Sequence, residues 1–237
     1  MEAGSVMTHE PGNTHLSIGL FLLTFSTGLI DAASFIALGH VFTANMTGNV
    51  VFLAFAVAGV PGLSFPRSLA SLAAFMIGAV IGGRLNLHFG KGGRQRCINA
   101  AAAGETLLLV LAVIGVMWAR NPSDQVGTHV AYAVIVLTAL AMGIRNAVVR
   151  KLAIPDLTTT VLTLTVTGLA AESSLAGGNN QRWFTRTAAI LTMFVGAFTG
   201  AILLRYGLVA PLAVSALLPV VFVGLLWLKP NLGPLQD

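Results

Sequence analysis

The residues of this chain best suited to chemistry are polar and charged side chains that interrupt long apolar stretches. Asp31 lies inside the first such stretch, where an ionisable group costs about 2.5–3.5 kcal/mol to insert into a membrane. Such a group usually faces a bundle interior or a cavity, and there it could couple transport to a proton or another ion. The alternative is an aspartate at a helix end near the membrane surface, because the span can end soon after Ala33.

Two clusters of threonine and asparagine come next, each at expected membrane depth. The first consists of Asn45, Thr47 and Asn49, and the second of Thr158, Thr159, Thr160, Thr163 and Thr165. Lipid cannot satisfy polar groups, so irregular backbone survives there only when protein buries it or when it lines a cavity. The clusters therefore predict a path for a small solute or ion. The alternative is hydrogen bonding between helices, worth about 0.6–2 kcal/mol per contact.

A repeat relates these features to one another. The segment 27–32, Thr-Gly-Leu-Ile-Asp-Ala, aligns with 142–147, Met-Gly-Ile-Arg-Asn-Ala. At the same offset 42–45 aligns with 157–160, and further on 78–82 aligns with 196–200. The halves, about 16–119 and 129–228, each close with an apolar helix ending in a tryptophan. This pattern predicts an internal duplication.

Arg145 and Asn146 occupy the repeat positions of Ile30 and Asp31. Arg145 lies about one turn from the end of its span, where it can pair with Asp31 across the pseudo-symmetry axis. Alternatively, it extends to the lipid headgroups. Both interpretations stay open at the level of sequence, and we place Arg145 and Asn146 among the expected path residues.

Four glycines are better explained by packing than by chemistry. Gly78 with Gly82, and Gly196 with Gly200, form small-xxx-small pairs that let helix backbones approach closely.

Several classes of function lack support in the sequence. It contains no His-Glu-x-x-His, no Gly-x-Ser-x-Gly and no phosphate-binding loop, so we expect no enzyme. Its five histidines are not paired at helical spacing and Cys97 is its single cysteine, so we expect no metal and no cofactor. The pI of about 10.2 rests on 13 basic and 8 acidic residues. The basic residues flank apolar stretches, which favours a lipid bilayer over nucleic acid as partner.

Composition places these residues in a membrane. Hydrophobic residues make up 56% of the 237-residue chain and charged residues only 9%, against about 25% charged in soluble domains. Mean hydropathy is +0.86. Stretches long enough to cross a bilayer are 16–38, 68–88, 98–119, 129–149, 185–206 and 208–228. The polar-rich stretches 41–60 and 157–173 are ambiguous, so the chain is all-α with either six spans plus two short, broken or re-entrant helices, or eight spans.

Charge placement favours six spans. With six, nine basic residues fall on one side and three on the other; with eight, the best division is seven to five. The positive-inside rule then puts both termini and the loop 91–96 in the cytoplasm. Each half would hold three spans, an odd number, so the second half would enter the membrane from the opposite side.

Two segments carry a resemblance to a known family. They are 28–51, with the core Asn45-Met-Thr-Gly-Asn49, and 143–160, where Gly-Ile-Arg-Asn-Ala-Val leads to Pro-Asp-Leu-Thr-Thr-Thr. The chain resembles the YoaK-like bacterial membrane proteins, the domain of unknown function 1275 family, over almost its whole length. Where the family tends to place glycine after the threonine matching Thr163, this chain has Leu164. The resemblance implies a bacterial multi-spanning membrane protein and supplies no substrate.

We therefore expect a single transmembrane domain, 1–237, that spans the bacterial inner membrane several times. The first hypothesis is a small secondary transporter for an unknown solute or ion, with a homodimer as its expected assembly. The second is a non-transporting scaffold or assembly partner, in which the same polar residues only hold helices together.

Overall fold

The computed structural model describes residues 11–89, 93–119, 127–152, 162–180 and 182–228, and helices joined by short loops make up this part of the chain. Its helices are α1 (Pro11–Ala37), α2 (Met46–Val57), α3 (Phe65–Phe89), α4 (Arg94–Trp118), α5 (Thr128–Leu152), α6 (Leu162–Ala171), α7 (Trp183–Leu203) and α8 (Val209–Trp227). Short 3-10 helices follow α6 (η2, Ser174–Ala176) and α7 (η3, Leu204–Tyr206). The predicted all-α fold is confirmed.

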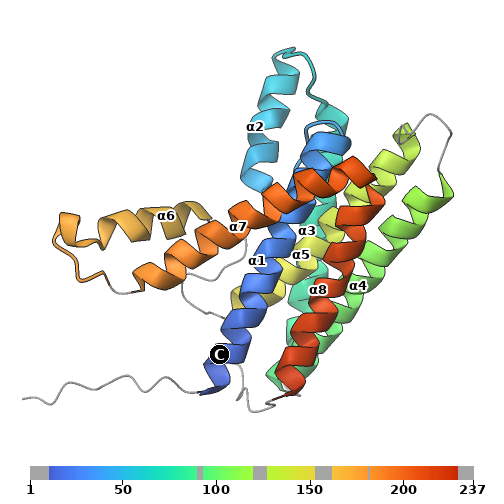
Figure 1. Ribbon diagram of the computed structural model, residues 1–237. Coiled ribbons are helices and arrows are strands. Elements are labelled where there is room, and N and C mark those ends of the chain that lie inside the picture. The colour runs from blue at the N-terminus through green and yellow to red at the C-terminus, as the bar shows by residue number, and fades with distance from the viewer. Residues whose placement is uncertain (1–10, 90–92, 120–126, 153–161, 181, 229–237) are drawn as a thin grey trace, which may run out of the picture.

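Six of these helices, α1, α3, α4, α5, α7 and α8, are long and apolar enough to cross a membrane. Their direction alternates along the chain, so the start of α1, the end of α3, the start of α4 and the end of α8 lie at one end of the bundle (Figure 1). The start of α5 lies at the other end, so the two groups of three spans run in opposite directions. This is the arrangement predicted for six spans.

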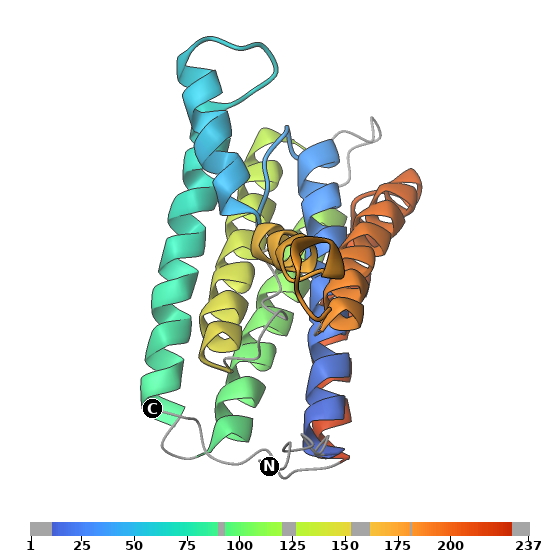
Figure 2. The ribbon, with the colours of Figure 1, turned by 90° about the vertical axis from the view of Figure 1, so that its left-hand side faces the viewer.

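The short helices α2 and α6 occupy the two ambiguous stretches. Their 12 and 10 residues extend over about 18 and 15 Å, less than the about 30 Å of a bilayer core. Eight spans remain compatible with the helices, but these lengths favour six. Figure 2 shows the α6–α7 hairpin projecting away from the bundle toward the viewer.

Two interfaces of the bundle use repeat-equivalent residues. In the first, between α1 and α7, a Cβ on Gly28 would lie 2.4 Å from the Met193 carbonyl oxygen, and one on Gly196 would lie 2.2 Å from that of Phe25. In the second, between α5 and α3, a Cβ on the equivalent glycine Gly143 would lie 2.2 Å from the Phe75 carbonyl oxygen, and one on Gly78 would lie 2.3 Å from that of Leu140. Each interface joins a helix of one half of the chain to a helix of the other half, so the two halves pack directly against each other.

The last helices of the two halves also correspond. Buried positions in α4 include Ala101, Ala102, Glu105, Leu109, Ala112 and Val116, and those in α8 include Pro211, Leu212, Ser215, Pro219, Phe222 and Leu226. The spacing is the same in both sets. One core cluster contains Leu16, Ile98 and Leu226, and another contains their equivalents Ala131, Leu208 and Val116. An internal duplication predicts this correspondence.

Reporter fusions can decide between six and eight spans. We expect fusions at Ala119, after α4, and at Leu228, after α8, to report opposite sides of the membrane. The reason is that the three long helices α5, α7 and α8 lie between these two positions, an odd number of crossings, whereas a crossing by α6 would make the number even. Alkaline phosphatase and fluorescent-protein fusions would measure the sides, and a shared side would support the eight-span alternative.

Candidate functional site

Asp31 is buried, with 3% of its surface exposed, more than one turn before the end of α1. Its Oδ1 accepts hydrogen bonds from the backbone N–H groups of Thr43 (3.0 Å) and Ala44 (2.9 Å). Its Oδ2 accepts one from the side-chain amide of Asn45 at 2.8 Å. The carboxylate thus binds the loop that joins α1 to α2, and the site is neither a helix end nor at the surface.

Asn49 holds the same loop from the other side. Its Oδ1 accepts from the backbone N–H of Phe42 at 2.9 Å, while its Nδ2 donates to the Phe42 carbonyl at 2.6 Å. Ser71 of α3 donates to the same carbonyl at 2.6 Å. Asp31, Asn45 and Asn49 therefore belong to one network that replaces helical hydrogen bonds across the break between α1 and α2.

Several of the remaining predicted path residues lie outside the network of Asp31, Asn45 and Asn49. Thr47 and Thr163 are exposed. Asn146 is half-buried and donates to the Met142 carbonyl of its own helix at 2.7 Å. Thr158, Thr159 and Thr160 fall outside the described residues, so a meeting of the two polar clusters stays a prediction.

Arg145 does not pair with Asp31, and it does not extend to the headgroups. It is buried on α5, and its Nε and Nη2 donate to both carboxylate oxygens of Glu105 on α4, the Nε bond measuring 3.0 Å. Its remaining N–H groups donate to α1: to the Leu23 carbonyl (3.0 Å), Thr27 Oγ1 (3.1 Å) and Ser26 Oγ (3.0 Å). Neither of the two alternatives for Arg145 is therefore observed: the loop occupies the Asp31 carboxylate, and Arg145 binds Glu105 instead.

Glu105 is the functional candidate that sequence reasoning missed. It lies near the middle of α4 and is 2% exposed. The signal was present, since an acidic residue in an apolar span is as costly there as Asp31 is in α1. Replacing either Glu105 or Arg145 by a neutral residue would leave the other charge buried without a partner.

A small cavity adjoins this ion pair. Besides Glu105 and Arg145, its walls are Leu23 of α1, Ile98, Ala101 and Ala102 of α4, Val148 and Val149 of α5, and Pro219 and Phe222 of α8. Four helices from both halves thus enclose one acid, one base and otherwise apolar surface.

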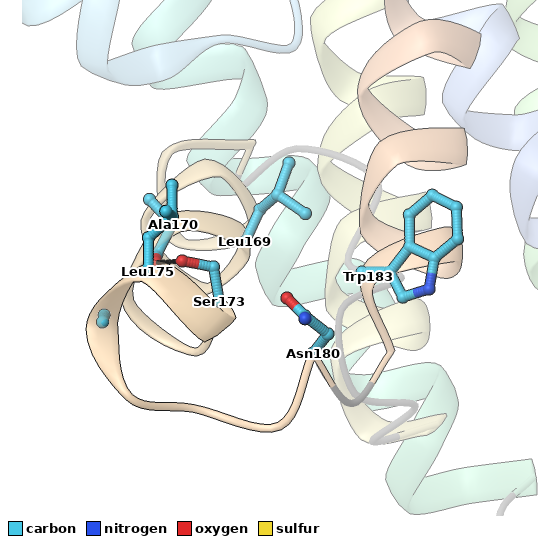
Figure 3. Close-up of a pocket in the computed structure, with 7 residues that line it drawn as sticks. Leu169, Ala170, Ser173, Leu175, Asn180 and Trp183 are labelled. Atoms are coloured by element: carbon cyan, nitrogen blue, oxygen red, sulfur yellow. Dashed lines mark hydrogen bonds between the residues drawn. The ribbon is translucent and has the colours of Figure 1, made fainter.

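A second, open hollow lies at the tip of the α6–α7 hairpin (Figure 3). Its lining includes Leu169, Leu175, Ser173, Asn180 and Trp183. Ser173 donates to the Ala170 carbonyl at 2.7 Å, and Asn180 Oδ1 accepts from the Ser174 N–H at 3.1 Å. These polar groups therefore stabilise the local turn, and the exposed Trp183 is of a residue type enriched at membrane surfaces.

The same hairpin is held by a second ion pair. Arg186 of α7 donates to both oxygens of Glu172 at 2.8 Å and to the Gly168 carbonyl at 2.7 Å. The Arg186 guanidinium holds the pKa of Glu172 below its ordinary value. Glu172 is half-exposed, so this pair contributes little compared with a buried one.

The Asp31 network leads to a mutational prediction. We expect Asp31→Asn to lower the free energy of unfolding by about 1–2 kcal/mol, because hydrogen bonds to a neutral acceptor are roughly half as strong as those to a carboxylate. Thermal unfolding in detergent would measure the loss, and hydrogen exchange at Thr43 and Ala44 would locate it. Unchanged exchange at these two amides would contradict the role of Asp31 in holding the loop.

Comparison with known proteins agrees with this architecture. A family model described as "Protein of unknown function (DUF1275)" matches residues 19–225. Over 159 residues the chain is 32% identical to the UPF0700 transmembrane protein YoaK of Bacillus subtilis (strain 168). That match covers 65% of this chain and 66% of YoaK, slightly less than two thirds of its length. No solved structure matches. The chain has six helices long and apolar enough to span a membrane, and the family model covers most of its length, so it belongs to the DUF1275 family and is a multi-pass membrane protein.

Proposed function

We propose that this chain is a small secondary transporter of the bacterial inner membrane that moves a small polar or charged solute. The observation that carries the proposal is that two three-span groups run in opposite directions and pack against each other. Each group has a short helix between its first and second long helices. Inverted halves with interrupted helices are a common plan of secondary transporters, because rocking one half against the other exposes a central site to alternate sides.

The glycine interfaces support such a motion. Close backbone contact at Gly28 with α7 and at Gly143 with α3 leaves few side chains interdigitated between the helices. Smooth helix surfaces of this kind can slide past each other by small shear movements. Buried Glu105 and Arg145 lie between helices of both halves, which is where a transported solute would bind.

The second candidate function is a non-transporting scaffold. It is favoured by the complete use of the Asp31 carboxylate in hydrogen bonds to its own loop. In that case the polar residues would stabilise the bundle and no water would reach its interior.

Cysteine labelling separates the two candidates. In a Cys97→Ser background, Ala101→Cys places a thiol on the cavity wall beside Glu105. We expect a water-soluble, membrane-impermeant thiol reagent to reach it from at least one side in oriented vesicles. Leu107→Cys is the matched control, because Leu107 lies on the same helix but is exposed toward lipid. If Ala101→Cys is as unreactive as Leu107→Cys from both sides, the scaffold is the better function.

A further inference from the structure

We propose that the end of α3, which charge placement puts on the cytoplasmic side, carries a binding site for one anionic phospholipid. Arg84 and His88 would hold the phosphate of its headgroup, and apolar side chains deeper on α3 would pack against its acyl chains. This inference does not rest on the proposed transport function, because such a site is compatible with a transporter and with a scaffold.

An open hollow of about 480 Å³ lies at this end of α3, which is ample room for a phosphate group. Its lining consists of Ile81, Arg84, Leu85, Leu87, His88 and Phe89. The guanidinium of Arg84 and the imidazole of His88 can donate hydrogen bonds to phosphate oxygens, and arginine does so in a two-pronged geometry. Two polar groups thus share the hollow with four apolar side chains, a composition that fits a lipid headgroup at the membrane boundary.

The exposed face of α3 changes from apolar to basic along its length. The exposed side chains in its middle are Met76, Ile77, Val80 and Ile81. Arg84 and His88 are also exposed and continue this face, because they lie one and two turns beyond Val80. A phospholipid that lies along α3 presents the same order of chemistry, with its acyl chains in the membrane interior and its charged headgroup at the surface.

Asn86 holds the end of α3 against two other helices. Its Nδ2 donates to the Ala147 carbonyl of α5 at 3.3 Å, and its Oδ1 accepts from the Cys97 thiol of α4 at 3.0 Å. The ends of α3 and α5 and the start of α4 are therefore neighbours at one end of the bundle. These contacts fix the backbone that forms the hollow, which reduces the entropic cost of binding a lipid there.

The neighbouring helix ends give the site positively charged surroundings. Their basic residues are Arg94 and Arg96 in the first turn of α4, and Arg150 and Lys151 in the last turn of α5. Neither α3 nor α5 contains an acidic residue, and Glu105 of α4 is buried against Arg145. Among the described residues Arg84 has no hydrogen bond or ion pair, so its exposed guanidinium can bind a phosphate without first losing a partner.

The fold itself does not require this basic pair. The repeat places Ile202 and Tyr206 at the positions equivalent to Arg84 and His88, by the offset between the paired glycines of α3 and α7. The equivalent surface lies at the opposite end of the bundle (Figure 1). The pair is therefore confined to the cytoplasmic side, where anionic lipids give the membrane surface its negative potential.

Native mass spectrometry of the purified full-length protein in detergent tests the site. The probes are phosphatidylglycerol and phosphatidylcholine with identical acyl chains, titrated separately. We expect the first phosphatidylglycerol to bind the wild-type protein about tenfold more tightly than the first phosphatidylcholine, because only phosphatidylglycerol brings a net negative charge to the basic surroundings. Glycerol phosphate is the third probe, and it should bind far more weakly because it has no acyl chains to pack against α3.

Variants of the basic residues give the decisive comparison. Arg84→Gln should lower the affinity for phosphatidylglycerol about tenfold, the size expected for one lost charged contact. Arg84→Lys should recover part of this loss, since it restores the charge but not the two-pronged geometry. Arg96→Gln is the matched control, because it removes the same charge from an exposed residue at the same end of the bundle but outside the hollow. Its affinity should change about twofold at most, because solvent screens a charge that does not touch the lipid.

The loss in Arg84→Gln can be separated from a folding defect. Without lipid, both glutamine variants should unfold at the Tm of the wild-type protein, because each replaces an exposed side chain. Equal binding of phosphatidylcholine and phosphatidylglycerol to the wild-type protein would overturn the proposal. Equal losses in Arg84→Gln and Arg96→Gln would also overturn it, since the basic end would then attract anionic lipid without a defined site. If glycerol phosphate binds as tightly as phosphatidylglycerol, the ligand is a free anion and the lipid site is wrong.

Discussion

Replacing Glu105 with leucine is expected to lower the free energy of unfolding by about 3–5 kcal/mol, because it leaves the Arg145 guanidinium buried without a counter-charge. Both side chains are almost completely inaccessible, with 1% and 3% of their surfaces exposed. Arg145→Leu should cause a loss of similar size, since it leaves the carboxylate of Glu105 buried alone. Thermal unfolding in detergent micelles measures both.

The double variant Glu105→Leu, Arg145→Leu is expected to be much more stable than the sum of the two single effects predicts. Removing both partners leaves no isolated charge, and apolar replacements of buried pairs are often neutral or stabilising. Thr27 retains its own bond to the Leu23 carbonyl at 3.0 Å, so α1 loses little. Glu172→Leu, at the half-exposed pair, should change stability far less. Simple additivity of the two buried variants would show that the charges do not interact as the geometry indicates.

The sequence was sufficient to predict the membrane-spanning helices. The predicted apolar stretches 16–38, 98–119 and 208–228 correspond to α1, α4 and α8, and most of their ends agree to within a few residues. The agreement is expected because a helix needs about 20 apolar residues to cross a bilayer. The break between α1 and α2 was also predictable, since Asn45 and Asn49 supply the hydrogen bonds that an interrupted helix loses.

The hydrogen-bonding partner of Arg145 could not be predicted from the sequence. Hydropathy places a residue at a depth in the membrane but does not say which way its helix is rotated. Pairing with Asp31 and extension to the headgroups were the two alternatives for Arg145, whereas the rotation of α5 directs it to Glu105 on α4. The partner of Arg145 depends on how α1, α4 and α5 pack together, and this arrangement depends on the close contacts between the two halves.

That packing should be highly sensitive at one class of position. Gly143→Ala is expected to lower the free energy of unfolding by about 3 kcal/mol, because its methyl group would lie 2.2 Å from the Phe75 carbonyl oxygen and force α5 away from α3. Gly28→Ala, at the equivalent position, should have a comparable effect through the Met193 carbonyl of α7, 2.4 Å away. Backbone atoms are the obstacle in both cases, so no side-chain rotation relieves the contact.

Gly83→Ala and Gly104→Ala are matched controls, because a Cβ at either position meets no atom within 4 Å. These changes should be neutral or stabilise their helices by about 0.5–1 kcal/mol, since alanine favours a helix over glycine. The comparison separates helix propensity from interhelical contact, and thermal unfolding of the four variants provides it. If Gly143→Ala and Gly28→Ala were as stable as the controls, the close interfaces between the halves would be wrong. A loss at Gly143 without one at Gly28 would instead confine the close contact to the α3–α5 side, and the equivalence of the two interfaces would fail.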